Sequence, residues 1–448
     1  MNLQLEADIP SDCGHLMVTM THDTKDRPYL YVAHKESGVS IYDISAPQTP
    51  TLAANVPLTL LDSLQVMSLS QDGDYLYLAT GTHFNDTEYS GMAIIDVSDP
   101  TNPVVTDLWH HPTGTGGSGI VRVEGDIAYL GAMKNGLVLL DVSNKDSIAF
   151  LSEIIPDINW PVNNPNADLY NARGMEVING IVYLCYDAGG VRVINCTDPK
   201  APVETGRFCN PVMYTPINRP RAYNNIVINN NLAYVTVDYC GVEVWDISDT
   251  SAMTLEGWWN PYNCPNNNWF TSPSHANEIH LDAQCNKLFV STGKSDLIVL
   301  DLSSGPTQPD SCTTYGGTGN GIGTWGVSIY NEFAYLSYVC TLGVPFASNW
   351  SGVKILRSPW CTTSTPESYP DLMEISVFPQ PASRDITVSM PASNATFSLI
   401  SINGSVVSAG EIDGESESID VSDLEPGIYF LHLSTGDSDI WKKIGVIR

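Results

Sequence analysis

Short runs of alternating apolar residues, separated by glycine, proline and polar turns, recur along most of the chain. The clearest run has glycine first, apolar residues at alternate positions and aspartate or asparagine last, and it occurs at residues 38–43, 91–96, 136–141, 190–195 and 241–246. Two degenerate copies follow at 296–301, without the glycine, and at 352–357, without the aspartate. These seven copies, 45 to 56 residues apart, indicate a repeat architecture.

Each copy follows a second β-rich run with a central aromatic residue. These aromatics are Tyr31, Tyr77, Tyr129, Tyr183, Tyr234, Phe289 and Tyr335. A further β-rich run comes before this one, and another comes after the aspartate. Because four short alternating strands make the blade of a propeller, we predict an all-β fold that begins with a seven-bladed β-propeller at residues 1–361.

The last repeat has three strands and no clear fourth. Residues 3–10 have the character of the missing strand, and they end in proline as several other fourth strands do. We therefore expect this N-terminal segment to pair beside residues 352–356, which would close the ring and remove two exposed edges.

The aspartate at the end of each copy is commonly followed by serine and proline, as in residues 96–100 (Asp-Val-Ser-Asp-Pro). An aspartate there accepts backbone N–H bonds and fixes the turn, so we assign these residues a structural role. The repeats resemble the LVIVD family of bacterial surface propellers, and the resemblance covers about residues 1–360.

The repeats stop near residue 360. Residues 362–371 are predicted to be a linker, and 372–448 contain short strands that favour a small immunoglobulin-like β-sandwich. Residues 426–430 (Pro-Gly-Ile-Tyr-Phe) and the basic tail are similar to a type A sorting domain of the type IX secretion system of Bacteroidetes; Gln380 stands where that family usually has Asn. The resemblance implies the secretion machinery as a partner and a secreted or outer-surface location. The alternative is an adhesion module.

The charge balance argues against two classes of partner. The chain has 50 acidic residues against 20 Lys and Arg, a formal charge of -30, which disfavours nucleic acid and anionic lipid. No run of eighteen apolar residues is present, so no membrane insertion is expected. Residues 1–8 lack the features of a signal peptide, and we expect any export signal to precede this numbering.

The ten cysteines include no Cys-x-x-Cys pair, so disulfides are favoured over a zinc ribbon, with buried free thiols as the alternative. Cys240 and Cys264 follow the second and fourth strands of the fifth blade. Cys340 and Cys13 occupy the matching places in the seventh, if residues 3–10 supply its fourth strand. We predict the pairs Cys13–Cys340 and Cys240–Cys264.

Long loops precede the first strands of blades four to six, at 157–172, 212–223 and 262–276. Such loops meet around the mouth of a propeller channel and are often functional. Aromatic rings beside Asn, Arg and Glu suit a glycan or another polar polymer. The candidate ligand-binding residues are Trp160, Tyr170, Arg173, Arg221, Tyr223, His275, Asn277, Glu278 and Trp325. The alternative is that the loop aromatics pack on one another.

Catalytic signatures are lacking in the sequence, so we predict a non-catalytic binding or scaffold propeller without a cofactor. One alternative is a hydrolase or lyase acting on polysaccharide, with Glu278, Asp157 or Asp168 as acid and base; another is a purely structural surface-layer protein.

We expect no metal centre, because Glu278 and His280 are too few ligands. Asp72 and Asp74 are candidates for a structural calcium ion, although Asp72-Gly73-Asp74 is more simply a turn.

Overall fold

The computed structural model describes residues 2–82, 87–214, 222–264, 274–293, 295–317, 322–340, 348–357 and 360, followed by 376–378, 381–389, 395–401, 405–412, 414, 416–434 and 439–447. The chain divides into two compact units, Met1–Thr362 and Thr363–Arg448. The predicted linker, 362–371, lies outside the described residues.

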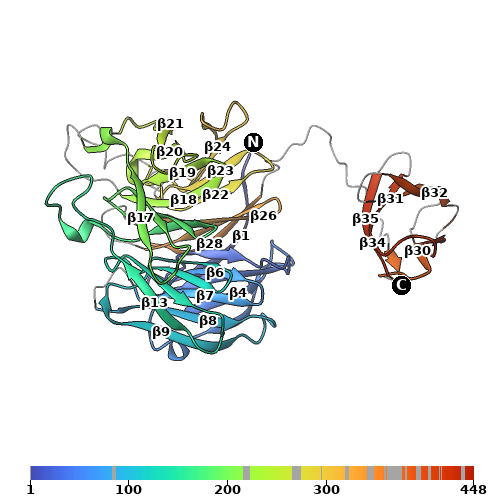
Figure 1. Cartoon of the computed structure of the whole chain (residues 1–448), viewed down its shortest axis with the longest axis horizontal. Helices are drawn as coiled ribbons and strands as arrows, with labels where there is room; N and C mark the ends of the chain where they lie inside the picture. Colours follow the sequence, from blue (N-terminus) through green and yellow to red (C-terminus); the bar gives the residue numbers. More distant parts are fainter. Residues whose placement is uncertain are drawn as a thin grey trace. The chain divides into compact units, whose positions relative to one another are not determined.

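Within the described residues of the first unit, the strands form seven four-stranded antiparallel sheets, which are the blades of a propeller. Figure 1 shows that each blade runs outward from the centre, as in the series β6 to β9. The innermost strands are β2 (Met20–His22), β6 (Val66–Asp72), β10 (Ile120–Glu124), β14 (Gly174–Ile178), β18 (Tyr223–Asn229), β22 (Ile279–Asp282) and β26 (Thr324–Tyr330).

The second strands carry the repeated aromatic residue. They are β3 (Tyr29–His34), β7 (Tyr75–Thr80), β11 (Ile127–Gly131), β15 (Ile181–Cys185), β19 (Leu232–Val237), β23 (Lys287–Ser291) and β27 (Phe333–Tyr338). The third strands hold the recurrent glycine-to-aspartate run. They are β4 (Gly38–Asp43), β8 (Tyr89–Asp96), β12 (Leu137–Asp141), β16 (Val191–Asn195), β20 (Gly241–Asp246), β24 (Leu297–Asp301) and β28 (Ser351–Arg357).

The fourth strands lie outermost and expose much of their surface. They are β5 (Thr51–Val56), β9 (Val104–Thr115), β13 (Ala149–Ile154), β17 (Val203–Phe208), β21 (Thr254–Trp259), β25 (Asp310–Tyr315) and, in the seventh blade, β1 (Gln4–Ser11). Single 3-10 turns occur at η1 (Leu58–Leu60), η2 (Ala167–Leu169), η3 (Pro211–Tyr214) and η4 (Asp238–Cys240).

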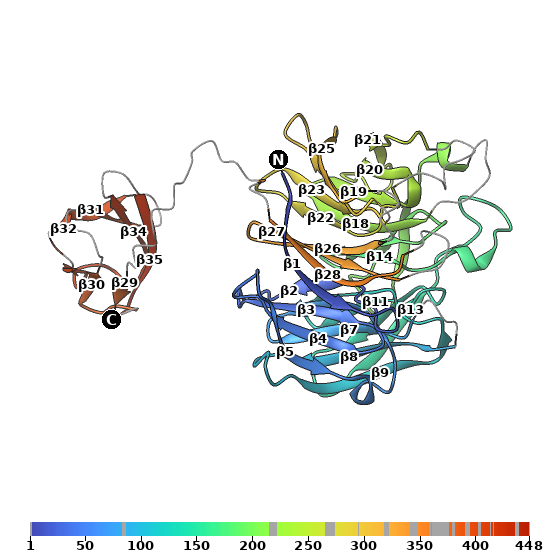
Figure 2. The same cartoon turned by 180° about the vertical axis from the view of Figure 1, so that it is seen from behind.

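The ring closes where the sequence analysis placed the missing strand. Strand β1 pairs antiparallel with β28, with Ile9 opposite Val353 and Ser11 opposite Ser351, and Figure 2 shows the two side by side. The first blade also touches the last, because Met17 N–H donates to Ser351 Oγ at 3.1 Å. The edges that an open ring would expose are therefore paired.

The repeat aspartates fix the turn after the third strand, as predicted. Each accepts a hydrogen bond from the backbone N–H two residues later, at 2.8 to 2.9 Å, and this holds for Asp43, Asp96, Asp141, Asp246 and Asp301. Such bonds favour the ionised carboxylate, and the backbone N–H of Ser45 lowers the pKa of Asp43.

The recurrent glycine has a steric cause. Gly38 and Gly241 have φ angles of 86° and 79°, in the region that favours glycine. A Cβ atom at either would lie 2.0 Å from the carbonyl oxygen of Val56 or Trp259, the last residue of the neighbouring fourth strand. The glycine thus lets the third strand begin against its partner.

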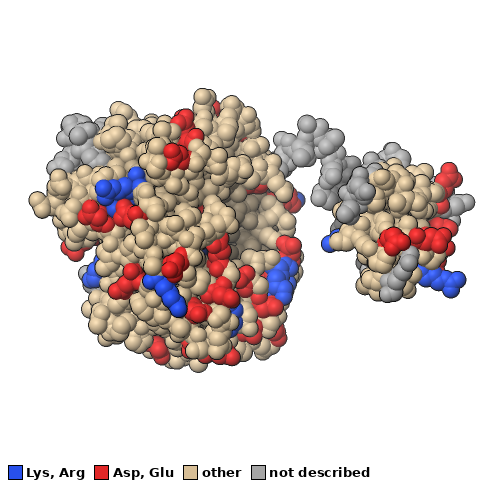
Figure 3. Space-filling model, viewed as in Figure 1, with Lys and Arg blue, Asp and Glu red and all other residues tan. Residues whose placement is uncertain are grey.

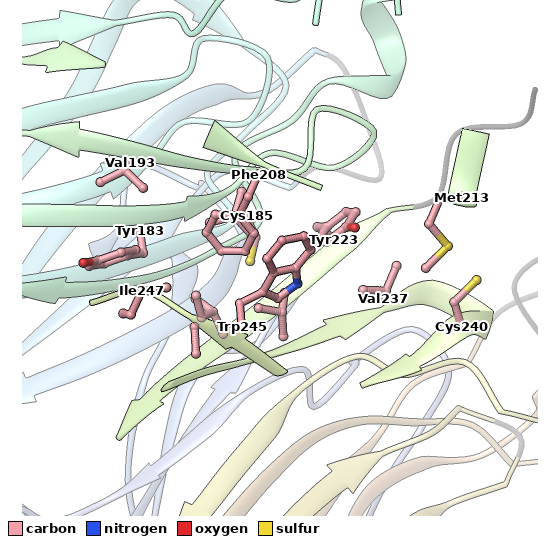
Figure 4. Close-up of a cluster of buried hydrophobic side chains, with 14 of the residues drawn as sticks. Tyr183, Cys185, Val193, Phe208, Met213, Tyr223, Val237, Cys240, Trp245 and Ile247 are labelled. Atoms are coloured by element: carbon pink, nitrogen blue, oxygen red, sulfur yellow. The ribbon is translucent and has the colours of Figure 1, made fainter. Parts of the chain in front are cut away.

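The apolar core lies between neighbouring blades. One cluster joins blades four and five through Tyr183, Phe208, Tyr223 and Trp245, and it is drawn in Figure 4. Both predicted disulfides are present: Cys13–Cys340 and Cys240–Cys264 have Cα separations of 5.3 and 5.2 Å. The cysteines at 185, 196, 209 and 312 are free.

The second unit consists of two small antiparallel sheets. One contains β29 (Ser376–Phe378), β30 (Asp385–Ser389) and β33 (Ser416–Asp420); the other contains β31 (Ala395–Ser401), β32 (Val406–Ile412), β34 (Gly427–Ser434) and β35 (Asp439–Val446). Tyr429, Leu431 and Leu433 alternate inward along β34 and join one buried cluster. The unit therefore has a core of its own.

Candidate functional site

One residue from each innermost strand lies opposite the repeated aromatic of the second strand. These residues are Thr21, Ser70, Arg122, Glu176, Val227, His280 and Ser328. All seven line a central cavity of about 550 Å³, and we call them the channel ring. The repeat thus places equivalent positions of seven blades around one space, which is within the usual size range of a small-ligand pocket.

Charge in this cavity comes from a few side chains. Arg122 Nε lies 3.7 Å from Glu176 Oε2, and Asn225 donates a hydrogen bond from Nδ2 to Glu278 Oε2. Burial raises the pKa of both glutamates, and Arg122 opposes the shift in each case. Burial also lowers the pKa of His280 to about 4, so this imidazole is neutral at pH 7.

The end of the channel where the innermost strands begin, here called the loop end, is narrow. Six residues located three positions before the channel ring gather there: Met67, Gly119, Arg173, Asn224, Asn277 and Trp325. The guanidinium of Arg173 lies 5.7 Å from the ring centroid of Trp325, a cation–π contact between blades four and seven. Only about 20 Å³ of space remains among these side chains.

The larger cavity reaches the opposite end, here called the turn end. Thr24, Asn229 and Ala283 line it, and they lie at or beyond the ends of β2, β18 and β22. The channel is therefore a pocket that the Arg173–Trp325 contact narrows at the loop end and that extends to the turn end.

Four predicted site residues come together at the loop end. Arg173, Asn277, Glu278 and Trp325 line the same small cavity, and Glu278 also lines the larger one. Asn277 is 3% exposed, and its Nδ2 donates to the carbonyl oxygen of Thr324 at 3.1 Å. Arg221 lies outside the described residues.

Trp160 and Tyr170 lie elsewhere. Trp160 packs on the guanidinium groups of Arg192 and Arg207, at 5.0 and 5.1 Å from its ring centroid. Tyr170 is 2% exposed and meets Tyr186 edge to face. Neither lines the channel cavities, because the 157–172 loop folds over blade four, where Tyr170 is buried and Trp160 is half-buried.

Tyr223 and His275 serve other buried contacts. The Tyr223 hydroxyl donates to Glu243 Oε2 at 3.0 Å and accepts from the Asn210 N–H at 2.8 Å. Burial raises the pKa of Glu243 to about 7, opposed by its hydrogen bonds. His275 Nε2 lies 2.8 Å from Asp238 Oδ1. These side chains hold blades and loops together, and they are not part of the channel wall.

The two aspartates considered as catalytic partners of Glu278 do not line a channel cavity with it. Asp157 is exposed and lies 3.6 Å from Arg207, and Asp168 is exposed in η2. Neither lines the channel cavities described above. The carboxylate that shares the larger cavity with Glu278 is Glu176.

Three further structural findings bear on the expected metal sites and on the expected lack of membrane insertion. Among the described residues, no group of three or more His, Cys, Asp or Glu could hold a metal ion. Asp72 and Asp74 flank Gly73 in the turn between β6 and β7, and Lys25 Nζ donates to Asp74 Oδ1 at 2.6 Å. In the same described part of the chain, no helix is long and apolar enough to cross a membrane.

Sequence reasoning missed Arg122 and Glu176. Each is a charged residue between apolar neighbours in an innermost strand, and each pairs with the repeat tyrosine of its blade, Tyr129 or Tyr183. Aligning the blades on that tyrosine would have shown the channel ring. The strand pattern alone did not, because it does not say which residues meet across the ring.

The fold and the channel define a β-propeller protein joined to a small β-sandwich unit. Family models match both parts: LVIVD repeats at residues 28–57, 65–107, 115–154 and 220–260, and a secretion system C-terminal sorting domain at 376–447. The chain therefore carries LVIVD repeats in its propeller and ends in a type IX sorting domain, which marks it for secretion to the cell surface. No curated protein sequence matches it significantly.

Solved structures similar to this chain include other propellers. One is the WD40 repeats of RRP9, with 13% sequence identity and a TM-score of 0.54; the match covers 80% of this chain and 99% of that one. Another is the Cps50 (Swd1) propeller of Myceliophteria thermophila, with 10% identity and a TM-score of 0.53; the match covers 80% of this chain and 100% of that one. PorZ, a surface component of the type-IX secretion system of Porphyromonas gingivalis, is 11% identical over 95% of this chain, with a TM-score of 0.43. The chain spans 65% of the PorZ chain. The similarity to RRP9 and Cps50 confirms the propeller fold.

Proposed function

We propose that this protein is a non-catalytic binding propeller of the cell surface that holds a glycan, or a unit of another polar polymer, in its channel. The observation that carries the proposal is the cavity of about 550 Å³, whose ring combines hydroxyl groups, a guanidinium and a carboxylate. Binding sites for sugars need such groups, because each hydroxyl of the ligand requires a hydrogen-bonding partner when it leaves water.

Contacts of the two cavity glutamates support binding over catalysis. Glu176 is close to Arg122, and Glu278 accepts from Asn225, so both carboxylates are already engaged by neighbours. The other acids weighed as catalytic partners, Asp157 and Asp168, are exposed on a surface loop.

A glycan array with the full chain tests the proposal, with Val227→Trp as the informative variant. Val227 is a channel-ring residue, so an indole there fills the cavity. The matched control is Val203→Trp, since Val203 is 57% exposed on outer strand β17. We expect glycan binding by the wild type and the control and loss of binding in Val227→Trp. Equal binding by both variants, or release of reducing sugar by the wild type, would contradict the proposal.

A further inference from the structure

Glu278 is the least compensated charge in the channel. Its carboxylate accepts from the Asn225 amide, lines both cavities, and forms no ion pair with any described residue. A partly buried carboxylate without a cation loses hydration that a neutral amide only partly replaces. A cationic group bound beside Glu278 would therefore be stabilised.

Nearby guanidinium groups form their ion pairs with other carboxylates and act on Glu278 only at longer range. Arg122 Nε lies 3.7 Å from Glu176, and Arg173 Nη1 lies 3.9 Å from Asp187, which is 7% exposed. Three carboxylates thus face two guanidinium groups. His280 adds no positive charge at pH 7, because burial lowers its pKa to about 4. Asp187 lines neither channel cavity, so the excess of one negative charge belongs to this group of five side chains when its three carboxylates are ionised.

The rest of the wall offers hydrogen bonds without charge. Thr21, Ser70 and Ser328 contribute hydroxyl groups from three blades, whereas the Gln71 amide in the same wall is already bonded to neighbouring residues. Hydroxyl groups donate and accept, so they suit a ligand that is itself rich in hydroxyls. An acidic sugar would bring a further negative charge towards Glu176 and Glu278, which is unfavourable because like charges repel.

We propose that the channel selects a hydroxyl-rich ligand that carries a primary ammonium group, such as a deacetylated amino-sugar unit, and that the ammonium binds Glu278. This inference rests on the proposed function, because it names the chemical class that the channel accepts. The ligand enters from the turn end, and its ammonium reaches Glu278 near the narrowed loop end.

Calorimetric titration of the full chain tests this selectivity. The probes are four β-linked disaccharides: the glucosamine dimer, its N-acetylated form, the glucose dimer and the glucuronic acid dimer. We expect the glucosamine dimer to bind at least tenfold more tightly than its N-acetylated form and the glucuronic acid dimer to bind most weakly. Loss of a hydrogen bond to a charged group corresponds to about 10-fold to 100-fold in affinity.

Glu278→Gln removes the negative charge of the side chain and keeps its shape, because glutamine still has an oxygen that accepts the hydrogen bond from Asn225. The control is Glu332→Gln, since Glu332 is an exposed residue of blade seven that pairs with Arg357 at 2.8 Å. We expect the preference for the glucosamine dimer to vanish in Glu278→Gln and to persist in Glu332→Gln.

The possible failures are distinguishable. If the neutral or acidic dimers bind as tightly as the glucosamine dimer, the charge selectivity is overturned and the binding function stands. The same conclusion follows if the preference survives in Glu278→Gln. If no disaccharide binds and the glycan array is also blank, both the selectivity and the proposed function are overturned.

Discussion

The disulfide Cys13–Cys340 should stabilise the propeller more than Cys240–Cys264 does. The first joins the segment after β1 to the segment after β27, across the point where the ring closes, and its cysteines are 327 residues apart. The second lies within blade five, and its cysteines are 24 residues apart. The Cα separations are nearly equal, so the lengths of the closed loops are the main difference.

The magnitude follows from chain entropy. For separations of 327 and 24 residues, the loop-closure model gives about 6 and about 3.5 kcal/mol at 25 °C, and measured values are often smaller. Replacing both cysteines of a pair with serine should therefore cost about 2 kcal/mol more for Cys13–Cys340 than for Cys240–Cys264. Removal of the first pair also frees β1 to leave the edge of blade seven.

Equilibrium unfolding in urea measures this difference. The comparison requires the two double serine variants and a control, Cys312→Ser, which changes a free, exposed thiol. We expect the unfolding midpoint to fall most in the Cys13/Cys340 variant, to fall less in the Cys240/Cys264 variant and to stay nearly constant in the control. Equal losses in the two double variants would refute the argument that ring closure determines the size of the effect.

Three other predictions concern export, the channel and acid stability. Deletion of 372–448 should leave the protein in the periplasm of a type IX-competent host, measured by cell fractionation; normal secretion would contradict the sorting role. In a double-mutant cycle of Arg173→Met and Trp325→Leu, urea unfolding should give a coupling of about 0.5–1 kcal/mol, whereas additive losses would argue against the cation–π contact. Hydrogen bonds, led by that from Ser303, lower the pKa of Asp301 to about 2. Because this pKa is below the unfolded value, Asp301 stabilises the fold above about pH 4 and loses this effect as the pH falls towards 2. Asp301→Asn should lose less stability than the wild type between pH 4 and pH 2, and an unchanged pH dependence would contradict the assignment.

Local chemistry made much of the fold predictable from the sequence. A strand needs alternating apolar residues, and the turn after the third strand is fixed by a side-chain oxygen at the position of Asp43, from aspartate or from Asn195, so these features recur in most blades. Gly38 recurs for the same kind of reason, because a side chain there would strike a carbonyl oxygen. The two disulfides were predictable once the repeat gave their cysteines equivalent positions.

The candidate site was less predictable from the sequence, because it is formed by contacts between segments that are far apart along the chain. Arg173 and Trp325 are about 150 residues apart, and they meet because blades four and seven both face one channel. Tyr170 and Tyr223 resemble surface residues in their loop-rich context, yet the structure buries both.

The sequence by itself determined the strands, the turns, the repeat and the sorting domain, since each depends on neighbours along the chain. Only the tertiary structure decided that Glu176 shares a cavity with Glu278 and that Arg122 approaches one of them. Strand alternation says which residues share a face, but the charge balance of a channel depends on which side chains seven separate blades bring to the same height.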